Sequence, residues 1–313
     1  MKLGVCVLNW NAGDALTKCL EQLRIACKDY VVELIVVDND SSDGSVDSLQ
    51  ARVGEVSVLR NSRNLGYARG NNVGAQYLCS KLCTHLLFIN PDVLISATSI
   101  GSLVESLSHD AGAGAAGGLP RNAQGISRMA ARSRPTPLEK LVSYGPLHRI
   151  PLVSHLSRRH FLDLENIEDG QRVYAICGAC ILFRTEAFQA AGGFDESTFL
   201  YEEELIMSER LQASRYFFVL SKRCTYFHTE AGSTRRMPYR RRLHFIQSEQ
   251  HLLKAYYGWH FGMRLLFRAC RYAEWAFYAA SWKLRPKLPA NESGLEQNHL
   301  PAVPRRAEAE ELH

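Results

Sequence analysis

The chain has 313 residues, and 46% of them are hydrophobic, which is enough to bury the core of one large domain or two smaller ones. Its 37 Lys and Arg residues against 32 Asp and Glu residues give a net charge of +5. That excess is too small for a dedicated nucleic-acid-binding protein, but it suits an anionic small ligand or a membrane surface. Nine scattered cysteines, no recognisable signal peptide and no apolar run of about 18 residues predict a cytoplasmic protein that does not span a membrane.

Strand and helix patterns alternate through the first third of the chain. Short apolar runs predict strands at residues 3–8, 31–37, 56–59 and 85–89, and helical spacing predicts helices over 14–27, 68–81 and from Asp43 or Ser45 to residue 52. This alternation indicates an α/β protein with a mostly parallel sheet, in which ligands bind beyond the carboxyl ends of the strands. Asn9, Asp38, Asn64 and Asp92 all follow such ends. We therefore expect these four positions on one rim of the sheet.

The remainder of the chain is less regular. Its patterns predict strands near 113–119, within 171–183 and at 216–220, helices over 185–191 and 200–213, and a loop with short helices over 121–170. A long helical, aromatic and basic pattern covers 239–282, where Arg264, Arg268 and Arg271 share one predicted face. Beyond residue 286 the composition is polar and rich in proline, which predicts a disordered tail.

A dense group of carboxylates lies around the start of the predicted helix 200–213. Gly192-Gly193-Phe194-Asp195-Glu196 is followed by Phe199-Leu200-Tyr201-Glu202-Glu203-Glu204, shortly after an apolar run that ends at Phe183. The surroundings of ionisable groups at the edge of a packed core tune their pKa values for proton transfer. This segment is therefore where the sequence predicts catalysis.

Four further strings precede this segment in the chain. They are Val7-Leu8-Asn9-Trp10-Asn11, Val37-Asp38-Asn39-Asp40-Ser41-Ser42-Asp43-Gly44-Ser45, Asn64-Leu65-Gly66-Tyr67-Ala68-Arg69-Gly70-Asn71-Asn72 and Phe88-Ile89-Asn90-Pro91-Asp92. His228 and Gly232-Ser233 follow it. Each string alone is weakly specific, but in this order and spacing they resemble the inverting family 2 glycosyltransferases with a GT-A fold. The similarity covers residues 3–235 and is closest to the bacterial rhamnosyltransferase-like branch.

The resemblance implies a nucleotide-sugar site on the rim. It assigns base and ribose binding to Asn9, Asn11, Asp38 and Asn39, and completes the nucleotide-binding set with Asn64, Gly66, Asn72 and Asn90. Side-chain amides and carboxylates read a pyrimidine edge by hydrogen bonding. Asn39 stands where relatives that read uracil carry a second Asp, so the base, uracil or thymine, is left open. Ordinary turn chemistry in a βα loop is the alternative explanation for the cluster around Asp38.

By the same resemblance, Asn90-Pro91-Asp92 stands in the place of an Asp-x-Asp metal motif. Asp92 would bind Mg²⁺ or Mn²⁺ together with two diphosphate oxygens, because hard cations prefer oxygen ligands. His228 resembles an additional ligand that some members supply, and Arg235 and Arg236 would hold the diphosphate. Taken alone, a proline after a strand is an ordinary strand stop, and a single histidine is ordinarily structural.

The resemblance also implies the catalytic base. Aligning Phe199-Leu200-Tyr201 with the family's motif makes Glu204 the base and Glu203 its neighbour. The chain departs from the motif twice, because the base is Glu where the family has Asp and Ile206 replaces a second Asp. An extra methylene moves a carboxylate by about 1.5 Å, which matters for in-line attack.

The implied reaction is a single displacement with inversion. Glu204 takes a proton from an acceptor hydroxyl, and that oxygen attacks the anomeric carbon of a nucleotide sugar, with dTDP-rhamnose favoured. The acceptor would be a glycan or a polyprenyl-diphosphate-linked sugar in bacterial cell-surface polysaccharide biosynthesis, held by Asp195 and Glu196.

Two alternatives stay open. A nucleotidyltransferase needs a Gly-rich, basic loop after its first strand, and Asn9-Trp10-Asn11-Ala12-Gly13 is not one. A catalytically impaired scaffold that binds a sugar nucleotide would account for the departures at Glu204 and Ile206.

The expected organisation is a GT-A catalytic domain over 1–236, with a nucleotide-binding half over 1–120 and an acceptor-binding half over 121–236. Basic amphipathic helices over 237–285 and a disordered tail over 286–313 follow. The helices either pack on the catalytic domain or rest on an anionic membrane surface, so we expect a cytoplasmic protein that is peripheral on the inner face of the plasma membrane. No nucleic-acid partner is expected.

Overall fold

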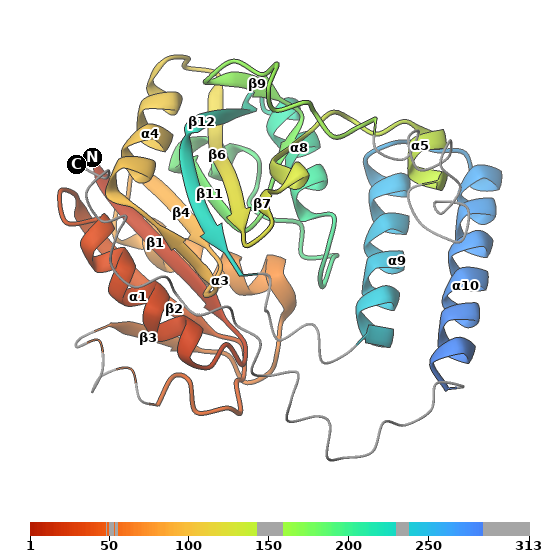
Figure 1. Ribbon diagram of the computed structural model, residues 1–313, viewed down its shortest axis with the longest axis horizontal. Coiled ribbons are helices and arrows are strands. Elements are labelled where there is room, and N and C mark those ends of the chain that lie inside the picture. Colours follow the sequence, from red (N-terminus) through yellow and green to blue (C-terminus); the bar gives the residue numbers. More distant parts are fainter. Residues whose placement is uncertain (48, 50–52, 54–55, 143–158, 230–237, 284–313) are drawn as a thin grey trace. The chain divides into compact units, whose positions relative to one another are not determined.

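The computed structural model of the protein (Figure 1) describes residues 1–283 except 48, 50–52, 54–55, 143–158 and 230–237. Contacts between residues divide the chain into Met1–Trp275 and Ala276–His313, and every contact discussed below lies within the first unit. Among the helices whose residues are described, none has the length and apolar character needed to cross a bilayer.

A ten-stranded mixed sheet forms the centre of the first unit. Its path consists of β1 (Lys2–Asn9), β2 (Val31–Asp38), β3 (Ser57–Arg60), β4 (His85–Ile89), β5 (Val93–Ile95), β6 (Ala113–Asn122), β11 (Cys180–Arg184) and β12 (Phe217–His228). They lie in the order β3-β2-β1-β4-β11-β6-β12-β5, while β7 (Gly125–Ile126) pairs with β6 and β9 (Gln171–Val173) with β12. Strands β1 to β4 are parallel, and β11 runs antiparallel between β4 and β6. Separately, β8 (Ala131–Arg132) pairs with β10 (Ala175–Ile176).

Helices cover both faces of this sheet. One buried cluster joins the sheet to α1 (Asp14–Ala26) and α4 (Ala97–Ser108), and a second joins it to α3 (Gly66–Ser80), α7 (Thr185–Ala190) and α8 (Glu203–Ala213). Along β1, Val5 and Val7 belong to the first cluster and Cys6 to the second, because successive side chains of a strand point to opposite faces. The predicted α/β architecture with a mostly parallel sheet is confirmed.

The register of the parallel strands confirms the predicted rim. Asn9 pairs with Asp38, Asp38 pairs with Arg60, and Val7 pairs with Ile89. The strands β1, β2, β3 and β4 therefore end at the same edge of the sheet, and the loops that follow them lie next to one another.

Several elements differ from the sequence-based expectation. The helix that was predicted from residue 200 begins at Glu203, because Tyr201 and Glu202 have φ values of +77° and +69°. The long pattern 239–282 forms two helices, α9 (Pro238–Ala255) and α10 (Phe261–Lys283), with Gly258 at φ +63° between them. In the irregular segment 121–170 one helix is α5 (Pro137–Val142). The helix expected up to residue 52 falls partly outside the described residues.

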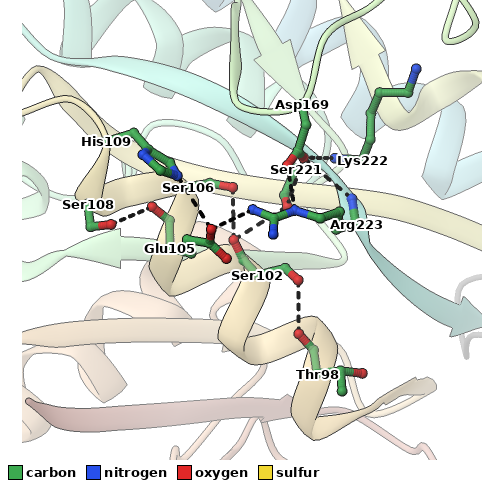
Figure 2. A network of polar contacts seen from close by, with 10 residues as sticks. All are labelled: Thr98, Ser102, Glu105, Ser106, Ser108, His109, Asp169, Ser221, Lys222 and Arg223. Atoms are coloured by element: carbon green, nitrogen blue, oxygen red, sulfur yellow. Dashed lines mark hydrogen bonds and ion pairs between the residues drawn. The ribbon is translucent and has the colours of Figure 1, made fainter. Parts of the chain in front are cut away.

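Strand β12 is longer than the predicted 216–220. It continues after a bulge, beyond the residues that pair with β9. Its register against β6 shifts between Leu220 and Thr225. Figure 2 shows Asp169 at this bulge, where it accepts the backbone N–H of Lys222 at 2.7 Å and pairs with Arg223 at 2.6 Å. Arg223 in turn pairs with Glu105 of α4 at 2.9 Å. A bulge bends a strand and increases its twist, which lets β12 leave β9 and continue along β5.

Gly66, at the start of α3, is required by the backbone. Its φ is +82°, and a Cβ there would lie 2.3 Å from the carbonyl oxygen of Phe199. Gly44 has a similar φ of +72° but open space around it.

We expect Gly44→Ala to lower the free energy of unfolding by about 1–2 kcal/mol through backbone strain alone, and Gly66→Ala to cost about 1–3 kcal/mol more through the clash. Urea denaturation of both variants measures the difference, and equal losses would contradict the close contact.

Candidate active site

A buried amide at the end of β1 holds the loop that follows β2. The Asn9 Nδ2 atom lies 3.0 Å from three oxygens, which belong to Asp38, Ser41 and Ser45. Asn9 is fully buried and Asp38 is 4% exposed. The Asn9 Oδ1 atom has no hydrogen-bond partner among the described residues, and a buried acceptor is costly unless water or a ligand satisfies it. The two side chains thus shape the loop from within, and direct nucleotide contact stays a prediction.

Asn39 joins this loop to the start of α3. Its Nδ2 atom donates to the carbonyl of Gly66 at 2.9 Å, and its Oδ1 atom accepts from Asn61 at 2.8 Å. Asn11 closes the neighbouring loop, since its Oδ1 atom accepts the backbone N–H of Ser42 at 2.8 Å. The structure therefore brings both predicted base-binding loops together.

Asn64 and Asn72 lie at different places on α3. Asn64 accepts the N–H of Gly66 at 2.9 Å and so supports the first turn of the helix. The Asn72 amide exchanges two hydrogen bonds with the backbone of Phe194, at 2.9 and 3.0 Å, and a third with Glu196 at 3.1 Å. Asn72 therefore contacts the carboxylate segment, although it was predicted as a nucleotide ligand.

Asp92 and His228 meet where β5 pairs with the end of β12. His228 is paired with Val93 in the ladder, and its Nε2 atom lies 3.3 Å from Asp92 Oδ1. The His228 side chain is only 18% exposed and the Asp92 side chain 10%. The described part of the chain contains no cluster of three or more His, Cys, Asp or Glu side chains suited to a metal ion. Asp92 and His228 thus lie together, and metal binding by either stays a prediction.

A short turn before β11 joins the two halves of the site. The N–H of Gly178 donates to Glu204 Oε1 at 3.0 Å. The next carbonyl, that of Ala179, accepts the N–H of Asn90 at 2.8 Å. Adjacent Cα atoms are about 3.8 Å apart, so Glu204 and the turn that carries Asp92 lie against the same two residues. The Glu204 carboxylate and Asn90, two residues before Asp92, thus contact adjacent residues of one turn.

Arg132 contacts Glu204 directly, and Gly178 and Tyr67 shape its surroundings. Arg132 Nη2 lies 3.3 Å from Glu204 Oε2, and the side chains are 12% and 23% exposed. A Cβ at Gly178 would lie 2.3 Å from Glu204 Oε1, so the missing side chain makes room for the carboxylate. Tyr67 donates its hydroxyl to the carbonyl of Gly178 at 2.8 Å. Burial and the charges of Glu204 and Glu203 raise the pKa of Tyr67 well above its usual value, which keeps Tyr67 a donor.

Glu203 has different surroundings from Glu204. It is 8% exposed, and its Oε1 atom has no hydrogen-bond partner among the described residues. Burial, followed by the charges of Glu204 and Glu202, raises the pKa of Glu203 well above its usual value. Burial thus disfavours the charged form of Glu203 beside Glu204.

Asp195 and Glu196, the predicted acceptor ligands, point to different partners. Asp195 Oδ2 lies 2.7 Å from His251 Nε2 and accepts from the Tyr256 hydroxyl at 2.5 Å. Glu196 has a side chain that is 52% exposed and pairs with Arg69 at 3.3 Å. Glu196 is thus open to an acceptor, whereas Asp195 fixes α9 to the glycine turn. Acceptor binding by either residue stays a prediction.

Some expectations lie elsewhere or fail. Arg235 and Arg236 are outside the described residues. The expected basic face of the C-terminal helix was wrong in one member, because Arg271 is 2% exposed and bound to Glu249. Sequence reasoning also missed Arg132, because its surroundings show no periodic pattern.

Acid should weaken the attachment of α9 through Asp195. Burial alone would raise the pKa of Asp195, but hydrogen bonds from Tyr256 and His251 outweigh it and lower the pKa. A depressed pKa contributes stability that is present above the unfolded value of about 3.9 and is lost as the pH falls toward the folded value. We expect the free energy of unfolding to fall below about pH 4, and Asp195→Asn to flatten that part of the curve.

Urea denaturation across this pH range gives the slope. Asp47→Asn is the matched control, because Asp47 is 71% exposed and pairs only at the surface with Arg60; it should keep the wild-type slope. The same slope in Asp195→Asn would rule out this linkage.

Comparison with known proteins gives this geometry a context. The family "Glycosyl transferase family 2" matches residues 4–192. The N-acetylglucosaminyl-diphospho-decaprenol L-rhamnosyltransferase of Mycobacterium tuberculosis is 27% identical over 297 residues, which cover 91% of this chain and 90% of that protein. A low-salt glycan biosynthesis hexosyltransferase of Haloferax volcanii is 27% identical over 205 residues, covering 65% of this chain and 59% of that protein.

Solved structures share the fold at low sequence identity. A mannosyltransferase from Pyrobaculum calidifontis, in complex with GDP-Man and Mn²⁺, is 15% identical with a TM-score of 0.53 and covers 94% of this chain and 79% of its own. GalNAc-T7 with UDP, GalNAc and Mn²⁺ is 16% identical with a TM-score of 0.53, covering 73% of this chain and 44% of its own. The protein therefore has the GT-A fold and belongs to glycosyl transferase family 2, the inverting glycosyltransferases.

Proposed function

We propose that the protein transfers rhamnose from dTDP-rhamnose to a sugar linked to a polyprenyl diphosphate, in the biosynthesis of a bacterial surface polysaccharide. The observation that carries the chemistry is the position of Glu204, which is bound by the N–H of Gly178, next to the Ala179 carbonyl that binds Asn90 of the Asp92 turn. The mycobacterial relative supports the sugar and the acceptor class, because its name specifies a rhamnosyltransferase and a diphospho-decaprenol acceptor.

Glu204 acts as the general base in this proposal. It removes the proton from an acceptor hydroxyl while that oxygen attacks the anomeric carbon, and the nucleoside diphosphate leaves from the opposite face. One displacement inverts the anomeric configuration. The Gly178 N–H and Arg132 fix the two carboxylate oxygens of Glu204, so the base is oriented before the acceptor arrives.

Asp92 and His228 fit a divalent metal ion. The Asp92 carboxylate and the His228 imidazole are one hard and one borderline ligand, and they lie 3.3 Å apart with little solvent exposure. Mg²⁺ or Mn²⁺ bound there would neutralise charge on the departing diphosphate. The Mn²⁺ in the two solved structures supports this proposal. The two residues would hold the diphosphate end of the donor, and Asn9, Asp38 and Asn39 would surround its base.

The two departures from the family motif are accommodated by packing. The longer Glu204 carboxylate occupies the place where a side chain at residue 178 would lie. Ile206 is 1% exposed and packs in an apolar cluster with Leu252 of α9, where a second Asp would be buried without water. These contacts favour an active enzyme over the catalytically impaired scaffold.

The lipid-linked acceptor makes a membrane contact useful, and α10 has a face that suits it. Phe261, Met263, Leu265 and Leu266 are 72%, 41%, 54% and 52% exposed. Arg268 is exposed and Arg264 is half-buried on the same helix. Large apolar side chains between arginines are typical of helices that lie in the interface of an anionic bilayer. We therefore include peripheral binding to the inner face of the plasma membrane in the proposal.

Glu204→Gln should lower the turnover number for transfer by about 10²- to 10⁴-fold, because the amide cannot accept the proton. The assay measures release of dTDP from dTDP-rhamnose in the presence of Mn²⁺ and a polyprenyl-diphosphate-linked N-acetylglucosamine. Thermal stabilisation by dTDP-rhamnose should stay unchanged, since the nucleotide loops are intact.

Glu209→Gln is the matched control on the same helix. Glu209 binds Arg134 and Tyr174, and its variant should keep wild-type turnover. A wild-type protein that binds nucleotide sugars but releases no nucleotide with any donor and acceptor would favour the scaffold instead.

Leu265→Glu should weaken binding to vesicles that contain phosphatidylglycerol by about 10-fold, because a buried leucine contributes about 1.5–3 kcal/mol. Co-sedimentation with vesicles measures the affinity. Leu82→Glu is the control, since Leu82 is 82% exposed in the turn after α3. Equal binding of both variants and the wild type would exclude α10 as the contact.

A further inference from the structure

Four buried charged side chains form an ionic chain from α10 to the start of α8. Arg271 Nε lies 2.8 Å from Glu249 Oε2, and its Nη2 atom lies 3.1 Å from Glu249 Oε1. Lys140 Nζ lies 3.8 Å from Glu249 Oε1 and forms a short ion pair with Glu202. The exposed fractions of Arg271, Glu249, Lys140 and Glu202 are 2%, 0%, 5% and 6%. Two positive and two negative charges are thus buried together.

The Arg271 side chain also binds the backbone of α5. Its Nη2 atom donates to the carbonyl of Lys140 at 2.5 Å, and its Nη1 atom to the carbonyl of Leu141 at 3.4 Å. Because a guanidinium is a planar fork of donors, a single side chain holds α5 and α9 in a fixed relation. Lys140 is then aimed at Glu202.

The ionic chain ends at Glu202, which pairs with Lys140. Glu202 immediately precedes α8 and has φ +69°, and Tyr201 before it has φ +77°. Non-glycine residues in the left-handed region persist only when the surrounding structure holds them there. The next two residues along the chain are Glu203 and Glu204. A change of the backbone at residue 202 would therefore move both carboxylates.

Helix α9 holds the preceding residues from one face. Arg241 Nε donates to the Tyr201 hydroxyl at 2.8 Å, and Ser248 donates to the carbonyl of Leu200 at 2.9 Å. Between them on the helix, the His244 ring stacks on Phe199 with centroids 4.4 Å apart. These spacings of three to four residues lie on one side of a helix.

Stability is a weak reason to bury these four charges. Taking charges out of water is costly, and replacing a buried ion pair by apolar side chains is often neutral or stabilising. What a hydrogen-bonded ionic chain supplies is a fixed direction for each member. The member in contact with the active site is Glu202.

We propose that Lys140, Glu249 and Arg271 are positioning residues, which act through Glu202 to hold the left-handed turn that aims Glu204 at Gly178. The C-terminal helices are then part of the catalytic machinery. This inference rests on the proposed role of Glu204 as the base.

The first test is the kinetics of Lys140→Met. The turnover number should fall about 10- to 100-fold because the base is displaced, while KM for the nucleotide sugar changes less than about 3-fold because the donor loops are untouched. Lys140→Arg should restore most of the turnover. Added to Glu204→Gln, Lys140→Met should cause no further loss, since residues that act as a unit are not additive.

The matched control is Arg184→Met. The Arg184 side chain binds the carbonyls of Leu107 and Ala113. In the ladder between β11 and β4, Arg184 lies opposite His85 at the start of β4, away from the rim. It should lower the melting temperature and leave the turnover number unchanged. Wild-type turnover in Lys140→Met, or full additivity with Glu204→Gln, would overturn the proposal.

Hydrogen exchange provides a readout that needs no substrate. In Lys140→Met the amides of residues 199–206 should exchange faster, while those of β1 and β4 keep their protection. If the wild type transfers no rhamnose with any acceptor, the proposed function fails, yet this measurement still decides whether Lys140 holds the turn. Unchanged protection of 199–206 would overturn the positioning role by itself.

Discussion

The hydrogen bond from the Gly178 N–H to Glu204 is the contact on which the arrangement of the active site depends. Three segments that are far apart in the sequence contact the backbone of residues 178 and 179. The start of α8 supplies the carboxylate, α3 supplies the Tyr67 hydroxyl that binds the Gly178 carbonyl, and the adjacent Ala179 carbonyl holds Asn90. Because a backbone N–H has no rotamers, and because Gly178 lies just before β11, the position of the Glu204 carboxylate is fixed relative to the sheet.

Three consecutive acids at the start of α8 have three different surroundings. Glu202 is buried in an ion pair with Lys140, Glu203 is buried with a pKa raised by that burial, and Glu204 is partly exposed beside Arg132. Surroundings that separate the states of neighbouring carboxyl groups assign them different tasks. Of the three, Glu202 and Glu203 are buried and Glu204 is not, which suits Glu204 to the role of base proposed above.

The sequence predicted the nucleotide-binding half well, because its signals are local. Short apolar runs and the polar residues after them placed Asn9, Asp38 and Asp92 on one rim, and the register of β1, β2 and β4 confirms that these strands end together. The acceptor side depends on contacts between distant residues of opposite charge or of irregular pattern. Nothing local marks Lys140 as the partner of Glu202, or turns Arg271 from an expected surface position toward Glu249. Such contacts follow from the tertiary fold and have no period in the sequence.

The fit between Gly178 and Glu204 also limits which residues can occupy the two positions together. The Glu204 carboxylate fills the space that a Cβ at residue 178 would need. A protein with a shorter acid and a glycine would merely carry a gap, whereas one with the longer acid and an alanine would have its base forced aside. Residues 178 and 204 are therefore coupled, and a longer acid at residue 204 keeps this position only while residue 178 is glycine.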